Sequence, residues 1–342
     1  MFLRFRCVKL FSFLFVCLGL LLFHALLLSQ HSYAGGPAKG ESCRNKGAIG
    51  VSRVLEIDTS TGPRYGRVQF KDQLLPLRHK EVVITFDDGP LPSVTKSILR
   101  TLKRHCTKAT FFAVGKMAKA YPQIIQKVYS EGHTIGAHTH SHPRDLRHHY
   151  FPYSRFQIER GFQDVQTATG RPIAPFFRFP GLHDYKKMND YLSDRHIANF
   201  SVDIVPGDTS GYSPARIIRN TLSQLRRRGK GILLLHDIKP ATAAALPRLL
   251  SALKARGYKI VHIVPRKPFK PVPIALINML YEDFSHKDPK TIIGGLTYRQ
   301  LYGGKSAKKA KRAFRQQSHK KRSRKYRGKR YSKRVYGRKR RY

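Results

Sequence analysis

Acidic residues are scarce in this chain. Of 342 residues, 20 are Asp or Glu against 66 Lys and Arg, which gives a formal charge of +46. A charge of this sign attracts polyanions such as nucleic acid, lipid headgroups or acidic envelope polymers, and it does not identify a fold. Residues 305–342 hold 20 of the basic residues and no acidic residue. Such a composition cannot build a hydrophobic core, so we expect a disordered basic tail there.

Cysteine and tryptophan are also rare. The four cysteines include no Cys-x-x-Cys spacing, which disfavours a cysteine-ligated zinc site, and tryptophan is absent. Cys7 and Cys17 lie in an apolar N-terminal segment. The other two, Cys43 and Cys106, either pair in an oxidising compartment or remain as free structural thiols.

Residues 1–34 have the pattern of a targeting segment. Basic residues precede an almost wholly apolar run, residues 10–28, which is long enough to span a bilayer. Small residues at Ser32 and Ala34 then fit a cleavage site before Gly35. The cleavage site favours a signal peptide over a retained membrane anchor. In either case we expect the rest of the chain to be exported, to the periplasm or the cell envelope.

From residue 81 to residue 264, short β-branched or aromatic runs alternate with helical stretches. We expect seven strands, at residues 82–86, 109–114, 134–137, 176–179, 197–202, 232–235 and 259–263. We expect helices between them at residues 93–103, 117–130, 154–169, 214–228 and 242–256. This alternation predicts an α/β fold whose parallel sheet closes as a barrel, with polar residues gathered at the carboxyl ends of the strands.

The predicted barrel sets the domain organisation. The segments expected are a targeting segment (1–34), an N-terminal extension (35–80), the barrel domain (81–265), a C-terminal extension (266–303) and the basic tail (304–342). The N-terminal extension is expected to be a linker with a short strand pair near residues 51–57 and 66–70. The C-terminal extension includes an apolar stretch at residues 274–280.

Two groups of residues in the barrel domain can carry chemistry. Asp87 and Asp88 follow the first strand, so that one carboxylate can bind a cation while the other accepts a proton; a helix-capping turn is the alternative. His138 and His142 lie four residues apart and can meet one metal ion, although a solvated histidine cluster is the alternative. Together with Asp88 they form a two-histidine, one-carboxylate set that suits hydrolysis by zinc or another divalent ion.

These two groups, in this order and about 50 residues apart, resemble the first two motifs of the polysaccharide deacetylases. This family is carbohydrate esterase family four, also called the nodulation-type chitooligosaccharide deacetylase domain. Residues 177–181 (Phe-Arg-Phe-Pro-Gly) resemble its third motif and residues 233–237 (Leu-Leu-Leu-His-Asp) its fifth. The resemblance covers residues 81–265 and implies an irregular parallel (β/α)7 barrel. It also implies metal-dependent removal of acetyl groups from an N-acetylglucosamine polymer, whether chitooligosaccharide, peptidoglycan or exopolysaccharide.

The resemblance implies a role for each matching residue. A divalent metal, with Zn²⁺ the expected ion, would be held by Asp88, His138 and His142. The other implied roles are general base for Asp87, its orienting partner for Arg178, oxyanion donor for the Gly181 amide, general acid for His236 and acetyl-pocket wall for Leu234. These residue types together polarise an amide carbonyl, supply a nucleophile and protonate the leaving nitrogen.

The fourth motif departs from the family pattern, which is Asp-x-x-Asp-Trp. This chain has no tryptophan there, and Asp208 is our choice for the carboxylate that tunes the acid histidine, with Asp203 as the second choice. Tyr212 is a candidate to replace the missing aromatic wall. Gly181, where many relatives carry an aromatic residue, opens the cleft further. Both departures affect the size of the substrate more than the type of reaction.

The basic tail has its own expected partner. Export argues against nucleic acid, so we expect residues 305–342 to bind an anionic envelope surface, while the barrel binds N-acetylated polysaccharide. The alternative function is a non-catalytic envelope polyanion-binding protein that reuses the same barrel. Metal content separates the two, because the alternative needs no bound metal.

Overall fold

The fold is known for most of the chain between the targeting segment and the C-terminal extension. A computed structural model describes residues 43, 45–149, 151–273 and 275–279, and the backbone of residues 292–293 and 296–297. The predicted targeting segment and basic tail lie outside the described residues, as does most of the C-terminal extension. Within the described ranges, no helix is both long enough and apolar enough to cross a membrane.

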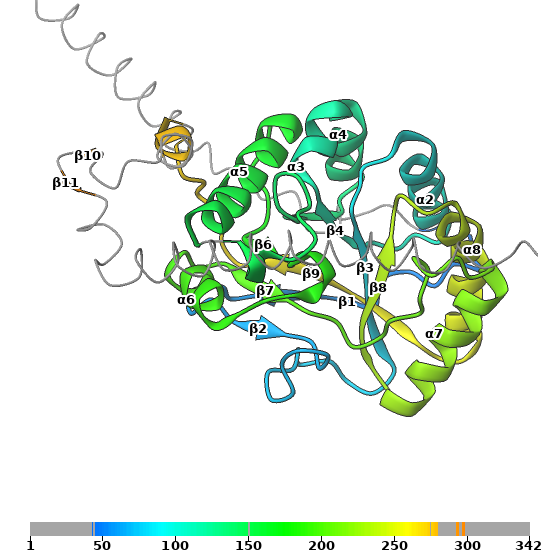
Figure 1. Ribbon diagram of the computed structural model, residues 1–342. Helices are drawn as coiled ribbons and strands as arrows, with labels where there is room; N and C mark the ends of the chain where they lie inside the picture. Colours follow the sequence, from blue (N-terminus) through cyan, green and yellow to red (C-terminus); the bar gives the residue numbers. More distant parts are fainter. Residues whose placement is uncertain are drawn as a thin grey trace, which may run out of the picture.

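A nine-stranded sheet forms the centre of the molecule (Figure 1). Its strands are β1 (Arg53–Ile57), β2 (Arg64–Tyr65), β3 (Glu81–Asp87), β4 (Thr110–Ala113), β5 (Thr134–Ala137), β6 (Phe176–Phe177), β7 (Ala198–Phe200), β8 (Gly231–His236) and β9 (Lys259–Pro265). The order is β1-β9-β3-β4-β5-β6-β7-β2, and β8 also pairs with β3. Every pairing in this sheet is parallel. The predicted parallel α/β fold is therefore confirmed.

Helices cover the outside of the sheet. They are α2 (Pro92–Arg104), α3 (Gly115–Ala120), α4 (Pro122–Ser130), α5 (Phe151–Thr169), α6 (Lys186–Asp194), α7 (Pro214–Arg228) and α8 (Pro240–Ala255), with short 3₁₀ turns η1 (Leu146–His148) and η2 (Pro180–Leu182). A small hairpin, β10 (Ile292–Ile293) and β11 (Leu296–Thr297), lies further along the chain.

The sheet closes into an irregular barrel through the chain after β7. Ile204 forms an isolated parallel bridge with Leu233 of β8. The backbone N–H groups of Asp203 and Ile204 donate to the Ile232 carbonyl at 2.9 and 3.0 Å. The Asp203 carboxylate in turn accepts the N–H of Ile232 at 2.8 Å. Side-chain and backbone hydrogen bonds thus take the place of regular strand pairing between β7 and β8.

Two layers of apolar side chains lie on the two faces of the strands. Val83, Phe112 and Phe200 belong to the cluster inside the barrel. Ile84 and Ile98 belong to the cluster between the strands and the helices. Because both faces of β3 are covered, all seven of its residues are buried. A parallel strand that is covered on both faces needs apolar residues on both, and β3 is apolar from Val82 to Phe86 except at Thr85, which is why the sequence reveals these strands well.

Two helices differ from the prediction. The helix expected at residues 117–130 is two helices, α3 and α4, which meet at Tyr121 with φ −133° and ψ 59°. Pro122 follows, and the ring of a proline disfavours helical backbone in the residue before it. The helix α6 was not predicted, because its buried face is carried by only two apolar residues, Met188 and Leu192.

The N-terminal extension contributes two strands to the sheet. β1 pairs with β9 and β2 pairs with β7, so the expected pairing of the two strands with each other is wrong. The strand expected at residues 66–70 is also wrong. Gly66 adopts φ 103°, and the N–H of Phe70 donates back to its carbonyl, which makes a turn. Cys43 and Cys106 form a disulfide, which decides between the two alternatives for these cysteines.

Candidate metal centre and active site

Polar residues from three strands meet at the carboxyl edge of the barrel. Asp87 ends β3 and stands opposite His236, which ends β8, in the register of these two strands. His138 follows the last residue of β5. Parallel strands place their carboxyl ends at one edge, so motifs far apart in the sequence come together here.

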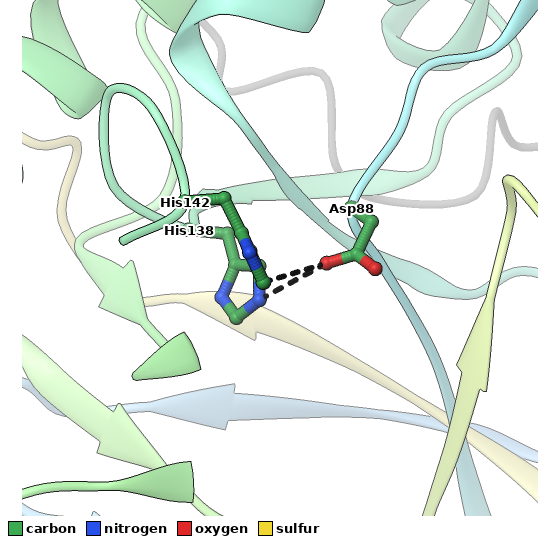
Figure 2. Close-up of side chains that lie close together, drawn as sticks. All are labelled: Asp88, His138 and His142. Atoms are coloured by element: carbon green, nitrogen blue, oxygen red, sulfur yellow. Dashed lines mark ion pairs between the residues drawn. The ribbon is translucent and has the colours of Figure 1, made fainter. Parts of the chain in front are cut away.

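Asp88, His138 and His142 converge at this edge (Figure 2). The Oδ1 atom of Asp88 lies 3.1 Å from Nε2 of His142 and 3.4 Å from Nε2 of His138. The three ligand atoms all lie within 4.8 Å of one another. Among the described residues, Oδ1 of Asp88 is buried and has no hydrogen bond of good geometry. A buried oxygen that faces two imidazole nitrogens fits a divalent cation with open coordination positions.

The histidine loop has a strained, well-supported backbone. Thr139 and His142 have φ values of 70° and 54°, and the Thr139 hydroxyl accepts the N–H of His142 at 3.0 Å. The carbonyl of Gln157 on α5 accepts the N–H of His140 at 2.8 Å. The ring of His140 turns away from the cluster, with Nδ1 2.6 Å from Oδ2 of Asp164. His138 and His142, which lie four residues apart, therefore both face Asp88, whereas the ring of His140 between them does not.

The charge state of the cluster follows from its contacts. Burial raises the pKa of Asp88, but the contacts with His138 and His142 outweigh it, so the pKa lies well below its ordinary value. The same contact with Asp88 raises the pKa of His142. Nδ1 of His138 lies 2.7 Å from the carbonyl of Arg178, which favours a proton on Nδ1 and leaves Nε2 free as a ligand.

Arg178 and Asp87 form a buried ion pair beside the cluster. Nη1 of Arg178 donates to Oδ1 of Asp87 at 2.6 Å and to the hydroxyl of Thr85 at 2.8 Å. Its Nε donates to the carbonyl of Phe200, and its guanidinium lies 4.2 Å from the ring centroid of Phe112. Arg178 is fully buried, and burial lowers its pKa. With this many partners, Arg178 holds Asp87 in one position, where Oδ2 lies 3.9 Å from Nε2 of His138.

His236 contacts Asp208 rather than Asp203. Oδ1 of Asp208 lies 3.0 Å from Nδ1 of His236, and Oδ2 accepts the N–H of His236 at 2.8 Å. Burial alone lowers the pKa of His236, but the hydrogen bond and charge of Asp208 more than offset it, so the pKa lies above its ordinary value. Thr242 on α8 also donates to Asp208. Asp203 instead accepts backbone N–H groups, including that of Arg67.

Leu234, Gly181 and Tyr212, which were predicted as pocket wall, oxyanion donor and substitute aromatic wall, lie in different surroundings. Leu234 is almost buried in the cluster inside the barrel. Gly181 has a φ of 61°, and a Cβ atom there would meet the ring of His183 at 3.0 Å. Tyr212, the candidate for the missing aromatic wall, packs against Gly207 next to Asp208, with the guanidinium of Arg216 3.7 Å from its ring centroid.

Asp237 is the last residue of the fifth motif, and the sequence analysis gave it no role beside the candidate site. Its Oδ1 accepts the N–H of Gly89, directly after Asp88, at 3.0 Å. Its Oδ2 accepts the hydroxyl of Thr95 at 2.7 Å. A Cβ atom at Gly89 would lie 2.1 Å from this carboxylate, so only glycine fits. Burial raises the pKa of Asp237 to about 7. No sequence signal marks this contact, because the partners are 148 residues apart.

An α/β barrel whose carboxyl edge holds a candidate metal site, the buried carboxylate of Asp87 and the carboxylate-bound His236 can be compared with known families. The family described as polysaccharide deacetylase matches residues 75–198. A chitooligosaccharide deacetylase of Azorhizobium caulinodans is 31% identical over 193 residues, covering 52% of this chain and 90% of the relative. The chain therefore belongs to the polysaccharide deacetylase family, as the motifs predicted.

Other relatives carry different names. A peptidoglycan-N-acetylglucosamine deacetylase of Listeria monocytogenes is 32% identical over 216 residues, covering 62% of this chain. The chain spans only 44% of the length of that relative. Among solved structures, a peptidoglycan deacetylase of Bdellovibrio bacteriovorus has a TM-score of 0.59 and 31% identity, covering 68% of this chain and 64% of the other. This similarity agrees with the barrel described above.

Proposed function

We propose that this protein is a metal-dependent hydrolase that removes N-acetyl groups from an N-acetylglucosamine-containing polysaccharide. The observation that carries the proposal is the arrangement at one barrel edge of a three-residue metal site, a buried carboxylate and a histidine held by a second carboxylate. Peptidoglycan and chitooligosaccharide are the leading substrate classes, since relatives named for both are similar to this chain.

The metal site would lie at the centre of the proposed reaction. Asp88, His138 and His142 would hold the ion, for which Zn²⁺ is the leading candidate given the nitrogen and oxygen ligands. When bound, the ion polarises the acetyl carbonyl and lowers the pKa of water. Leu234 contributes to the pocket for the acetyl methyl group.

Asp87 is the proposed general base. Its carboxylate takes a proton from the attacking water, and the ion pair with Arg178 fixes its orientation. The N–H of Gly181 donates to the oxyanion that develops on the acetyl carbonyl; among the described residues it donates to no other acceptor. Donors and charges that are fixed before the reaction stabilise a developing oxyanion without the cost of reorganisation.

His236 is the proposed general acid. The contact with Asp208 supports a protonated imidazole, and this proton passes to the leaving amine nitrogen. The strong positive charge and the departure of the fourth motif from the family pattern were the reasons for considering a non-catalytic protein. The contact between Asp208 and His236 supports the hydrolase, because it is the contact that the fourth motif is expected to provide.

The proposed setting of this activity is outside the cytoplasm. The cell-wall names of relatives support export, with residues 1–34 as a signal peptide or as an anchor through residues 10–28. We propose that the basic tail, residues 305–342, binds an anionic envelope surface.

Acetate release tests the function directly. The purified full-length chain is supplied with Zn²⁺ and given a panel of N-acetylglucosamine oligomers and peptidoglycan. We expect release by the wild type and at least a roughly 10²-fold lower kcat for Asp87→Asn, with metal binding retained. Equal turnover by the two proteins, or no release from any member of the panel, contradicts the proposal.

A further inference from the structure

The loop that carries the candidate ligands His138 and His142 has an unfavourable backbone conformation. Thr139 and His142 have φ values of 70° and 54°, in the left-handed region. This region costs free energy for any residue that has a Cβ atom, and such residues persist only where their surroundings hold them in place. The contacts that hold this loop therefore also hold the two ligand histidines.

Backbone hydrogen bonds hold the middle of the loop from two sides. The N–H of Gly115, the first residue of α3, donates to the carbonyl of Thr139 at 2.9 Å. The N–H of Lys116 donates to the carbonyl of His140 at 2.8 Å. On the other side, the N–H of His140 donates to the carbonyl of Gln157 on α5 at 2.8 Å. The loop is thus bonded to both α3 and α5.

One face of α5 packs against the loop. Gln157, Gly161 and Asp164 are spaced four and three residues apart, so they lie on the same face of the helix. The side chain of Gln157 accepts the N–H of Ser141 at 3.0 Å. A Cβ atom at Gly161 would lie 2.6 Å from the carbonyl carbon of Thr139, so the helix backbone itself touches the loop. Asp164 completes this face, about one turn further along.

Asp164 adds a side-chain contact to these backbone contacts. Its Oδ2 atom lies 2.6 Å from Nδ1 of His140. Its Oδ1 atom accepts the Nε–H of Arg160 at 2.9 Å, and Nζ of Lys119 lies 3.9 Å away. The side chain of Asp164 is only 4% exposed. Because both oxygens have partners, this buried carboxylate has little freedom to turn, and it can fix the imidazole that it contacts.

We propose that Asp164 is a positioning residue for the candidate metal centre and acts through His140. The proposal rests on the metal site of the proposed function and deepens it. His140 lies midway between the two ligand histidines, so its contact with α5 holds the loop in the conformation in which both ligand rings face Asp88 (Figure 2). Asp164 itself contacts neither the metal nor the substrate.

His142 depends on this support more than His138 does. His138 is buried, and Nδ1 of its ring lies 2.7 Å from the carbonyl of Arg178, outside the loop. The side chain of His142 is 37% exposed, and its own backbone is left-handed. A loop that relaxes therefore moves the ring of His142 away from Asp88 first, which weakens metal binding without unfolding the barrel.

Two substitutions of His140 separate the contact with Asp164 from simple packing. The amide nitrogen of asparagine is as many bonds from the backbone as Nδ1 of histidine, so His140→Asn keeps a donor for Asp164 and loses the ring. His140→Phe keeps a ring beside Phe156, whose ring centroid is 5.8 Å away, and loses the donor. A packing role makes His140→Phe the milder change, whereas the positioning role makes His140→Asn the milder change.

The measurement is the Kd for Zn²⁺ of the folded full-length proteins, by competition with a chelating dye. We expect the Kd to rise about tenfold in His140→Phe and Asp164→Leu, the low end of the effect of residues that support metal ligands. Both variants still bind Zn²⁺, because all three ligands remain. His140→Asn should stay within about threefold of wild type, because the donor is kept. The free energy of unfolding without metal is measured in parallel by urea denaturation.

The matched control is His196→Phe. It removes a contact between the ring Nδ1 and the carbonyl of Ser60, before β7 and so at the amino edge of the barrel. The control should bind Zn²⁺ like wild type. If Asp164→Leu does not fold, the two His140 variants decide. A Kd that rises more in His140→Asn than in His140→Phe, an equal Kd in all proteins, or an equal rise in the control overturns the positioning role.

The Kd is measured whether or not acetate is released, which keeps this proposal separate from the catalytic one. If the wild type binds Zn²⁺ and the variants follow the expected order but no acetate is released, the deacetylase proposal fails and the positioning role stands. If the wild type releases acetate and His140→Phe binds Zn²⁺ as tightly as wild type, the positioning role fails and the deacetylase stands. A wild type that binds no Zn²⁺ contradicts both.

Discussion

Asp208 contacts His236 twice, through Nδ1 of the ring at 3.0 Å and through the backbone N–H at 2.8 Å. One carboxylate thus fixes both the position of this residue and the protonation of its ring. The sequence left two candidates for this role, and the geometry separates them, since the carboxylate of Asp203 is bonded to the N–H groups of Ile232 and Arg67.

The first prediction concerns the pH profile. Asp208 holds the pKa of His236 above its ordinary value, and a general acid loses activity as pH rises through its pKa. We expect Asp208→Asn to move the alkaline limb of kcat to lower pH and to reduce kcat by about 10- to 100-fold. Asp203→Asn is the control; it should lower thermal stability and leave the alkaline limb where it is.

The second prediction concerns the buried ion pair. Arg178→Met leaves the Asp87 carboxylate buried without its charged partner, which we expect to lower the free energy of unfolding by about 3–5 kcal/mol. Arg178→Met combined with Asp87→Asn should recover part of this loss, because the unpaired charge is gone. Urea denaturation of the four proteins measures the coupling. A double variant less stable than Arg178→Met contradicts this account of the pair.

The third prediction concerns metal binding. A metal that binds only the folded protein stabilises it by about 2.7 kcal/mol at a free concentration of about 100 times Kd. We expect added Zn²⁺ to raise the Tm of the wild type and of His140→Ala, whose ring faces Asp164. Asp88→Ala and His142→Ala should lose this response. Chelation should reverse it in the wild type. An equal loss in His140→Ala would mean that the ligand set is wrong.

The fourth prediction concerns Asp237 in the metal-free protein. Its folded pKa of about 7 lies above the unfolded value, so the folded state binds more protons than the unfolded state between these two pH values. The free energy of unfolding that this group contributes is therefore present at low pH and is lost as pH rises toward 7. The total loss is about 1.4 kcal/mol for each unit by which the folded pKa exceeds the unfolded pKa.

Asp237→Asn removes that dependence. The amide oxygen can still accept the N–H of Gly89, and the amide N–H can donate to the hydroxyl of Thr95. We expect the variant to gain stability relative to wild type as pH rises from about 4 to about 7, measured by urea denaturation at a series of pH values. A constant difference across this range is the result that contradicts a raised pKa for Asp237.

The sequence predicted most of the barrel because its strands are buried on both faces. Mostly apolar runs such as Val82–Phe86 of β3 differ clearly from the alternating apolar and polar pattern of a strand with one exposed face. Weak elements were missed: α6 buries a narrow apolar face, and the two-residue strand β2 has no periodicity to detect.

Within the candidate site, local spacing revealed the candidate metal ligands but not the residues that support them. Asp88, His138 and His142 lie in recognisable motifs, and they do converge. The hydrogen bond from the N–H of Gly89 to the carboxylate of Asp237 depends on the register between β3 and β8. This register cannot be predicted from the residues of either strand alone. The choice of Asp208 over Asp203 likewise depends on how the loop after β7 closes the barrel.

The disulfide between Cys43 and Cys106 also fixes where Cys43 lies on the barrel. Cys106 lies just past the end of α2, a helix that begins near the candidate site and runs to the opposite edge. Asn45 and Lys46 are bonded there as well, to Arg104 and Lys254. These contacts hold the start of the described chain at the edge of the barrel opposite the candidate metal centre, so the edge that would meet a substrate carries none of them.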